Sequence, residues 1–338
     1  MNLRRLLLAL SLIAAAARAQ SPDEQARFLA GLPVKDAKLA PLTAAKSWQT
    51  HAQSLDKSWA KMDRRQLLSV RGWALTKIPE IYKDTAPVLY FFSGPDFLYA
   101  NTFFPNASTY LLCGIEPVGE MPDVAAMPEG TVGLELDSLR GSLHTILKTH
   151  YFITKDMRTD LERLKLRGTL PLLYVFLART GCTIHEVKPI ASGVRIEFSK
   201  GGWKKQTLYY YKTDLSNGGG NAAFLKACRE HAPAVSLVKS ASYLMHGEGF
   251  SQARNFLLQN SRVILQDDTG IPFHFFDPKK WDVHLYGAYF RHGDMFGKYD
   301  QADLEAAYKE AKPMPLGFSF GYHWQRERGL LTVARVKK

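Results

Sequence analysis

Two short segments concentrate polar and ionisable residues beside apolar runs. The first, residues 93–101, reads Ser-Gly-Pro-Asp-Phe-Leu-Tyr-Ala-Asn, and the second, residues 242–254, reads Ser-Tyr-Leu-Met-His-Gly-Glu-Gly-Phe-Ser-Gln-Ala-Arg. A carboxylate and an imidazole on opposite sides of a bond suffice for general acid and base catalysis. A pair of carboxylates that follows the predicted strand 262–266 adds further acid and base groups. The candidate catalytic residues are Asp96, His246, Glu248, Asp267 and Asp268.

The same two segments carry hydroxyl, amide and guanidinium groups that are suited to holding a substrate. Polar groups at strand ends commonly furnish clefts. The candidate substrate-binding residues are Ser93, Tyr99, Asn101, Tyr243 and Arg254. The competing interpretation is that these side chains only cap the backbone of their own loops. The catalytic hypothesis requires the two segments to line one pocket, and a separation beyond about 15 Å would exclude it.

Asp268-Thr269-Gly270 resembles the triplet that carries the catalytic carboxylate of aspartic proteases. That family needs two such triplets, because two carboxylates share one proton. This chain has a single copy, and Gln266 and Asp267 stand where the family has apolar residues. We interpret Asp-Asp-Thr-Gly as a turn that ends a strand.

Gly317-Phe318-Ser319-Phe320-Gly321 has the pattern of the nucleophile elbow of α/β-hydrolases. An elbow must be followed by a helix and later by the acid and the histidine. Here an aromatic stretch follows, close to the last residue of the sequence. An alternating strand is the better prediction for this segment.

No motif predicts a cofactor or a metal. Gly218–Gly220 precedes a helix but lacks the Lys and Ser or Thr of a phosphate loop, so a flexible connector is expected. His246-Gly247-Glu248 and His292-Gly293-Asp294 could each offer two ligands, yet no HExxH pairing occurs.

The first nineteen residues have the features of a secretory signal peptide. Arg4 and Arg5 precede an apolar run from Leu6 to Ala17, and Ala17-Arg18-Ala19 gives the small-x-small cleavage pattern. We expect a periplasmic or secreted protein after cleavage near Ala19. Twelve apolar residues are too few for a spanning helix, which needs about 20, so no transmembrane segment is expected.

The composition favours a globular protein and does not indicate a particular class of binding partner. The 338 residues are 46% apolar and 22% charged, with a formal net charge of +12. The basic balance favours anionic partners such as envelope glycans or lipid headgroups. The longest basic runs are pairs such as Lys204-Lys205, so nucleic acid binding is not predicted. The sequence leaves the oligomeric state and the pairing of Cys113, Cys182 and Cys228 open, although apolar surroundings favour burial of the first two.

Residue periodicity predicts helices and strands in neighbouring groups. Helical spacing occurs over 48–62, 136–146, 157–164 and, apolar all round, 169–181; further helices are expected near 222–228, 251–259 and 300–308. Strands are predicted at 88–92, within 97–114, at 194–198 and 207–211 as a hairpin, at 262–266, near 273 and at 283–290, with 317–324 and 330–336 closing as a second hairpin.

This grouping predicts an α+β fold, with a largely antiparallel mixed sheet packed against helices and one central apolar helix. After the leader 1–19, residues 20–338 are expected to form a single domain, and the alternative boundary lies near residue 217.

Two functional hypotheses follow. In the first, the protein is an exported hydrolase that uses the carboxylate and histidine groups above. In the second, it is a non-catalytic protein that binds a glycan or another envelope component through stacking rings. The rings proposed for that role are Trp203, Tyr209, Tyr210, Tyr211 and Trp281.

Overall fold

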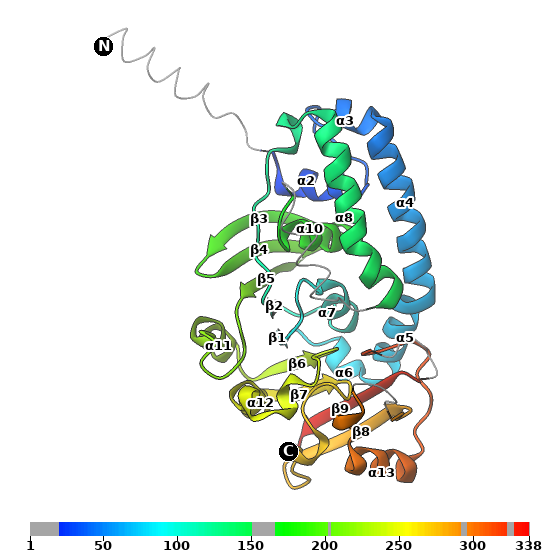
Figure 1. The fold of residues 1–338 in the computed structure, drawn as a ribbon, viewed down its shortest axis with the longest axis vertical. Helices are drawn as coiled ribbons and strands as arrows, with labels where there is room; N and C mark the ends of the chain where they lie inside the picture. The colour runs from blue at the N-terminus through cyan, green and yellow to red at the C-terminus, as the bar shows by residue number, and fades with distance from the viewer. Residues whose placement is uncertain (1–19, 151–165, 202–203, 292–295, 323–327, 338) are drawn as a thin grey trace, which may run out of the picture.

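The computed structural model describes residues 20–150, 166–201, 204–291, 296–322 and 328–337 (Figure 1). Within these residues nine strands form one sheet in the order β3-β4-β5-β2-β1-β6-β7-β9-β8. The strands are β1 (Val88–Tyr90), β2 (Thr109–Gly114), β3 (Cys182–Ile190), β4 (Gly193–Lys200), β5 (Lys204–Lys212), β6 (Ala234–Val238), β7 (Ser261–Gln266), β8 (Trp281–Gly287) and β9 (Leu330–Val336). Strands from both sides of residue 217 share this sheet.

The centre of the sheet is parallel and its two flanks are antiparallel. Strands β5, β2, β1, β6 and β7 run in the same direction. The hairpin β3-β4 extends one side antiparallel to β5, and β9 and β8 extend the other side antiparallel to β7. The α+β class with a mixed sheet packed against helices is therefore confirmed, but the parallel share is larger than expected.

Helices cover both faces of the sheet. The α-helices are α2 (Pro22–Leu29), α3 (Ala40–Ala44), α4 (Lys46–Met62), α5 (Leu68–Lys77), α6 (Pro79–Tyr82), α7 (Phe97–Phe103), α8 (Glu129–Thr149), α10 (Leu170–Arg179), α11 (Ala222–Glu230), α12 (Ser251–Asn260) and α13 (Ala302–Ala311). A π-helical turn, η1 (Asp63–Leu67), joins α4 to α5. Short 3₁₀ turns are η2 (Val124–Ala126), η3 (Leu244–His246), η4 (Glu248–Phe250), η5 (Phe273–Phe275) and η6 (Gly297–Tyr299).

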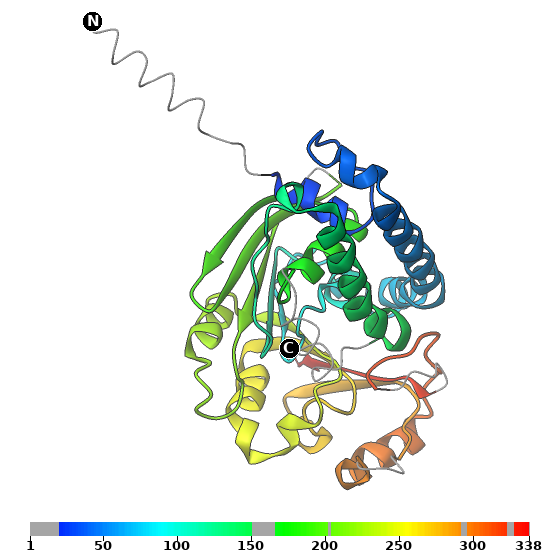
Figure 2. The ribbon, with the colours of Figure 1, turned by 45° about the horizontal axis from the view of Figure 1, so that its top comes forward.

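Alternation along the central strands divides the core into two halves. In β1, Val88 and Tyr90 face a large cluster with α4, α5, α7, α8 and α10, whereas Leu89 packs with α11 and α12 on the other face. Figure 2 shows α4 and α8 together on one side of the curved sheet and α11 and α12 on the other. A central strand that is buried on both faces is apolar throughout, as β1 is.

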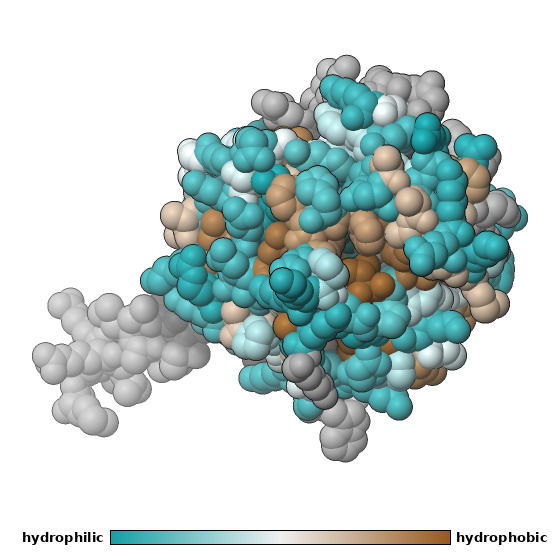
Figure 3. All heavy atoms as spheres, turned by 90° about the horizontal axis from the view of Figure 1, so that it is seen from below, coloured by the Kyte–Doolittle hydropathy of each residue, from teal (hydrophilic) through white to brown (hydrophobic). Residues whose placement is uncertain are grey.

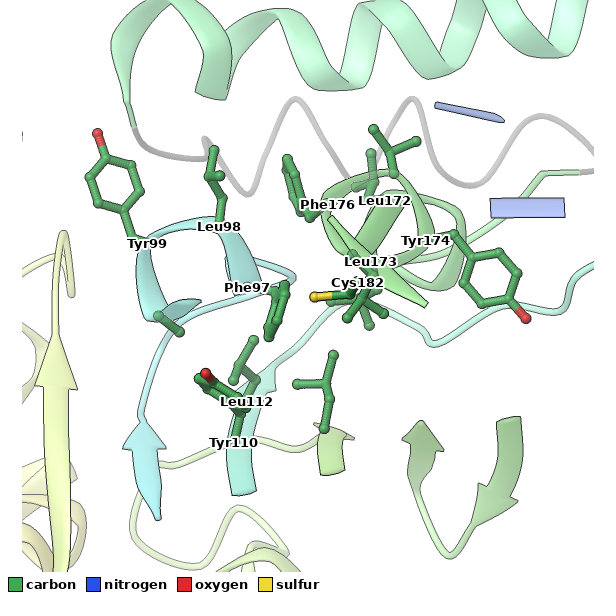
Figure 4. Close-up of a cluster of buried hydrophobic side chains, with 14 of the residues drawn as sticks. Phe97, Leu98, Tyr99, Tyr110, Leu112, Leu172, Leu173, Tyr174, Phe176 and Cys182 are labelled. Atoms are coloured by element: carbon green, nitrogen blue, oxygen red, sulfur yellow. The ribbon is translucent and has the colours of Figure 1, made fainter. Parts of the chain in front are cut away.

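Helix α10 forms the middle of the larger core half, as its apolar sequence predicts. Pro171 lies in its first turn and every residue from Leu170 to Ala178 is buried. Figure 4 shows its Leu172, Leu173 and Phe176 beside Phe97 of α7 and Leu112 of β2. The sheet, α7 and α10 are thus successive layers of one apolar cluster.

Three predicted strand regions have a different structure. The strand predicted near Phe273 is the 3₁₀ turn η5. Residues 97–103 form helix α7, which begins after Asp96 because its side chain accepts a hydrogen bond from the Tyr99 amide at 3.1 Å. The segment 317–322 does not pair with β9 as a hairpin; β9 lies between β7 and β8. The predicted helices over 48–62, 136–146 and 251–259 and the hairpin of β4 and β5 are confirmed.

Several expectations fall on residues outside the described ranges. These are the leader 1–19, the helix over 157–164, and the histidine segment that starts at 292. Cys113, Cys182 and Cys228 are all buried and unpaired, so the expected burial is confirmed. None of the described helices combines the length and apolarity needed to cross a membrane.

Candidate functional site

The parallel strands place a group of loops at one edge of the sheet. From β1 the chain passes through α7 to β2 on one side, whereas β6, reached later from β5 through α11, lies on the other side of β1. Ligand sites in such sheets lie beyond the carboxyl ends of the strands at the point where the connections diverge. The loops that follow β1, β6 and β7 are therefore the expected position of a ligand site in this sheet.

A buried ion pair joins the first two of these loops. The Nζ atom of Lys239, after β6, lies 3.0 Å from Oδ2 of Asp96, after β1, and their side chains are 2% and 3% exposed. The Tyr90 hydroxyl donates to the same oxygen at 2.8 Å. Lys239 also lies 4.2 Å from the centre of the Tyr99 ring, a cation–π contact. The pair fixes the two loops to each other.

Asp267, after β7, connects the third loop to this pair. Its Oδ2 accepts the Ser240 amide at 2.9 Å, and its Oδ1 accepts the Thr269 amide at 3.1 Å and the Thr269 hydroxyl at 2.5 Å. Burial, and then the carboxylates of Asp96 and Asp267, raise the pKa of Tyr90 well above its ordinary value. Both carboxylates are therefore close to one phenol, and the sequence-predicted residues Asp96 and Asp267 lie in one cluster.

Backbone strain gathers in these loops. Phe92, which follows β1, and Ser240, Ser242 and Tyr243, which follow β6, all have φ between 54° and 58°. Positive φ is unfavourable for residues with a Cβ and persists only where the surroundings impose it. The Oγ atom of Ser240 is buried and has no hydrogen-bond partner among the described residues. Strain of this kind clusters at functional sites.

An outer group of aromatic and ionisable residues covers the end of β7. The Tyr243 hydroxyl donates to Oδ2 of Asp268 at 2.8 Å, and the Tyr243 ring stacks on Tyr299 at 4.7 Å with an interplanar angle of 2°. The His246 ring packs edge-on against both tyrosines, at 5.2 and 5.7 Å. Asp268, Tyr243 and His246, all predicted from the sequence, are therefore brought together.

The His246 imidazole has a defined tautomer. Its Nε2 lies 3.2 Å from the backbone oxygen of Asp268, and a carbonyl oxygen can only accept, so Nε2 carries the proton. The Nδ1 lone pair is then available as a base. Burial is the main cause that lowers the pKa of His246 below its ordinary value of 6.5. The ring is thus neutral at neutral pH.

Glu248 and Arg254 do not join this group. The Glu248 side chain is 84% exposed and pairs with Arg254 at 3.1 Å. The Arg254 guanidinium donates to the Met245 carbonyl at 2.7 Å and lies 4.0 Å from the Phe275 ring centre. Both residues therefore stabilise the turn between η3 and α12.

Ser93 and Asn101 also have local partners. The Ser93 hydroxyl accepts from the Cys113 amide and donates to the Cys113 carbonyl, both at 3.1 Å, and so joins the ends of β1 and β2. The Asn101 amide donates to the Tyr110 hydroxyl at 3.2 Å and accepts from Lys200 at 2.7 Å, within α7, β2 and β4. Tyr99 is buried and covers Lys239, so its role is to enclose the ion pair.

Three neighbours of the site carry no signal in the sequence. Lys239 and Ser240 are single polar residues after a short apolar strand. Gln66, on the π-helical turn, donates to the Tyr99 hydroxyl at 2.9 Å and accepts from the Ser319 amide at 3.1 Å, so it links the site to residue 319. A single polar residue can be recognised as part of a site only when the fold shows what it contacts.

The ring set predicted for glycan stacking is not a surface. Tyr210, Tyr211 and Trp281 are 0%, 8% and 3% exposed, Tyr209 is half-buried, and Trp203 lies outside the described ranges. Three of the five rings therefore cannot present a face to a glycan.

The end of the molecule that carries β8 and α13 has its own apolar area. Figure 3 shows brown, apolar side chains gathered toward the centre of this face within a polar surround. A hollow of about 440 Å³ lies between β8 and α13, lined in part by Val283, Leu285 and Ala307. None of the candidate site residues lines it.

In the part of the chain that the structure describes, no group of three His, Cys, Asp or Glu side chains is arranged to hold a metal ion. Comparison with known proteins gives no matching family model, no similar curated protein and no similar solved structure. The function must therefore be argued from the geometry of the site.

Proposed function

We propose that this protein is an exported hydrolase whose acid–base centre lies at the carboxyl ends of β1, β6 and β7. The observation that carries the proposal is the convergence of three loops where the sheet connections diverge. These loops bring a buried ion pair, two further carboxylates and a neutral histidine together. Export rests on the leader 1–19, with cleavage near Ala19.

His246 is the proposed catalytic base. Its Nδ1 takes a proton from a water molecule as the water oxygen bonds to the electrophilic atom of the substrate. The bond to the leaving group then breaks, and the imidazolium returns the proton to that group. Net addition of water results, and one residue serves as base and then acid. The Asp268 carbonyl fixes the tautomer, and the ring contacts with Tyr243 and Tyr299 fix the orientation.

Asp96 and Lys239 act as positioning residues in this proposal. Both are almost fully enclosed, so neither touches the substrate. Their ion pair holds the loop after β1 against the strained loop after β6, on which Tyr243 and His246 lie. Catalytic groups require placement to within about 0.5 Å, which a rigid supporting contact provides.

The test compares His246→Gln with His284→Gln in the mature protein. Turnover of chromogenic esters, phosphate esters and glycosides is measured for both variants and for the unchanged protein. We expect a loss of about 10²- to 10⁴-fold in kcat for His246→Gln. No loss is expected for His284→Gln, because His284 is on β8 and partly exposed. The lowered pKa of His246 places the acidic limb of the pH profile below 6.5.

Equal turnover by the two variants, or no turnover of any substrate class by the unchanged protein, would contradict the proposal. The second result would favour glycan binding without catalysis. Phe296, Tyr299 and Tyr322 are half-buried rings beside the site, and Phe296 stacks on Tyr322 at 5.8 Å. Half-exposed rings of this kind can stack on sugar faces.

A further inference from the structure

Strand β8 is the last strand of the described sheet and pairs with β9 on one side. The backbone groups that face β9 belong to its even-numbered positions. The Lys280 carbonyl, just before the strand, accepts the Lys337 amide at 2.8 Å, and the Ala288 amide, just after it, donates to the Gly329 carbonyl at 3.1 Å. Backbone groups alternate in direction along a strand, so the odd-numbered positions of β8 direct theirs away from the sheet.

The protein's own chain closes both ends of this outer edge and leaves its middle open. The Trp281 amide donates to a carbonyl of the preceding turn at 2.8 Å, and the Gly287 amide donates to the Met314 carbonyl, after α13, at 2.9 Å. Between these two positions, the amides of Val283 and Leu285 have no hydrogen-bond partner among the described residues. The open part of the edge is therefore short and has defined limits.

The hollow of about 440 Å³ between β8 and α13 follows this open edge. Four successive residues of β8, from Val283 to Tyr286, line it. Successive side chains of a strand point to opposite faces, so a hollow that touches four in a row runs along the edge of the strand. Ala307, Ala311 and Pro313 line the other side, and Figure 1 shows α13 beside β8. The open amides therefore face a space that can hold a further segment of chain.

The opposite edge of the sheet, strand β3, has the features that prevent pairing with another chain. It contains Pro189, which has no amide proton, and its register with β4 is irregular between Ile184 and Glu186. The Asp23 side chain accepts the Ile184 amide at 2.9 Å. Strand β8, which is described throughout, contains neither proline nor lysine, and its register with β9 is regular. The two edges of one sheet therefore differ, and β8 is the edge suited to strand addition.

The lining of the hollow adds apolar surface and one negative charge. Besides the aliphatic residues above, the rings of Phe273 and Tyr286 line it. His284 pairs with Asp282 of the same strand at 2.8 Å. Glu310 of α13 is an exposed lining residue with no ion-pair partner in the described part of the chain. Apolar side chains and a cation complement such a lining.

We propose that the outer edge of β8 binds an extended peptide segment of a partner protein as an added strand, with apolar side chains in the hollow and a basic residue against Glu310. In strand addition, backbone hydrogen bonds give affinity, and pockets for alternate side chains give specificity. The β8 strand of a second copy suits the hollow less well, because its Leu285 already packs with Leu304 and Tyr308 of its own α13. The proposal does not depend on hydrolase activity, because its readout is binding.

The test measures fluorescence anisotropy of the labelled peptide acetyl-Lys-Val-Thr-Val-Thr-Val-Lys-amide with the mature protein. Two further peptides carry N-methyl groups, one on its valines and the other on its threonines. In an added strand only one of these two sets of amides faces β8. We therefore expect the unmodified peptide to bind, and one methylated peptide to bind about 10-fold or more weaker than the other.

Protein variants test whether the peptide occupies the hollow. Ala311→Arg places a long side chain there and should weaken binding of the unmodified peptide by about 10-fold or more. Ala306→Arg is the matched control, because Ala306 is also an exposed alanine of α13 but does not line the hollow, and it should not change the affinity. Glu310→Gln should weaken binding about 3-fold. Thermal unfolding verifies that the three variants fold.

Absence of binding of the unmodified peptide, equal affinity for the two methylated peptides, or equal losses in Ala311→Arg and Ala306→Arg would each overturn the proposal. An unchanged affinity in Glu310→Gln would overturn the assignment of a basic residue to this carboxylate. A dimer of the unchanged protein in analytical ultracentrifugation that Ala311→Arg dissociates would also overturn the proposal, because a second copy would then occupy the edge.

Discussion

At the scale of single residues, Lys239 shows how a charged group can be buried when contacts within the protein replace its hydration. Its ammonium group has lost its hydration and is compensated by the Asp96 carboxylate at 3.0 Å and by the Tyr99 ring. Such a pair contributes little net stability over an apolar pair, but loss of one partner leaves an uncompensated charge. The pair therefore acts as an all-or-none connection between β1 and β6.

This asymmetry predicts a specific result for a double-mutant cycle. Asp96→Asn and Lys239→Met should each lower the free energy of unfolding by about 3–5 kcal/mol. The double variant should lose less than the sum, because no unpaired charge remains. Urea denaturation measures all three. The comparison pair is Lys226 and Glu230, both well exposed on α11, where Glu230→Gln should leave stability almost unchanged. Additive losses at Asp96 and Lys239 would show that the pair is not coupled.

The sequence predicts the carboxylates and the histidine of the site but not the residues, such as Lys239, that hold them in place. Asp96, Asp267, Asp268 and His246 follow apolar strands or turns, a position that is visible in the residue order. The exposure of Glu248 depends on the direction of one turn, which residue order does not specify. Lys239 is recognisable only because β6 happens to lie beside β1.

At the scale of elements, the segment around residue 320 shows how a close approach requires glycine. Gly321 has φ of 71°, and a Cβ there would lie 2.1 Å from Oδ2 of Asp267. Any side chain would displace the carboxylate that holds the Ser240 amide. The segment that resembled a nucleophile elbow is therefore a wall of the site, and Ser319 is committed to hydrogen bonds with Gln66.

Gly321→Ala should destabilise the protein more than replacement of a glycine whose positive φ is unfavourable for alanine but whose surroundings leave room for a Cβ. Gly181 is the matched control, because its φ is 80° and its Cβ would meet nothing within 4 Å. We expect a loss of about 1 kcal/mol for Gly181→Ala. The loss for Gly321→Ala should be about 2–4 kcal/mol, because an overpacked contact is added. Thermal unfolding distinguishes them, and equal losses would mean that Asp267 moves aside without cost.

Helices and strands can be predicted from the sequence where the local pattern of apolar residues matches the surroundings of the element in the fold. Helix α10 is apolar on all sides because it is surrounded by other elements, and the β4-β5 hairpin has a glycine pair between alternating strands. The sequence predicts a strand in place of helix α7, because Phe97, Tyr99 and Phe103 favour strands in isolation. The Asp96 cap and burial of the helix outweigh that propensity.

At the scale of the whole molecule, the parallel centre of the sheet could not be derived from the order of elements. In the order of the sequence, β3 and β4 come between the sheet neighbours β2 and β5, so the strict alternation of strand and helix is lost. Pairing of β1 with β6 joins Val88 to Val235, and nothing local in either strand specifies that partner. Antiparallel neighbours joined by a tight turn can be recognised from the sequence of that turn. Parallel neighbours are joined by long connections, so their pairing cannot be read from any local segment.

Whole-molecule stability should depend on pH through His51 of α4. This side chain is fully buried, donates to the Leu29 carbonyl at 2.8 Å, and burial lowers its pKa from 6.5 to about 4. Between these two pH values the unfolded chain binds a proton that the folded protein does not. The contribution of His51 to stability is therefore complete above pH 6.5 and is lost as the pH falls to 4. The loss is about 3 kcal/mol.

Urea denaturation at pH 7 and pH 4.5 measures this effect in His51→Gln and in the unchanged protein. The variant keeps a donor for the Leu29 carbonyl but cannot titrate, so it should lose less stability on acidification. His284→Gln, on partly exposed β8, should behave as the unchanged protein does. An equal loss in all three proteins would assign the acid sensitivity to other groups.

The hydrogen bonds between Gln66 and Ser319 span 253 positions of the chain, and β7 depends on β9 for its second neighbour. During synthesis, the π-helical turn and the loops of the site emerge long before the segments that complete them. A nascent chain that ends before residue 330 lacks β9, so β7, which leads into Asp267 and Asp268, has only one of its two neighbours. The protein therefore acquires its working form only after the residues of β9 have been synthesised.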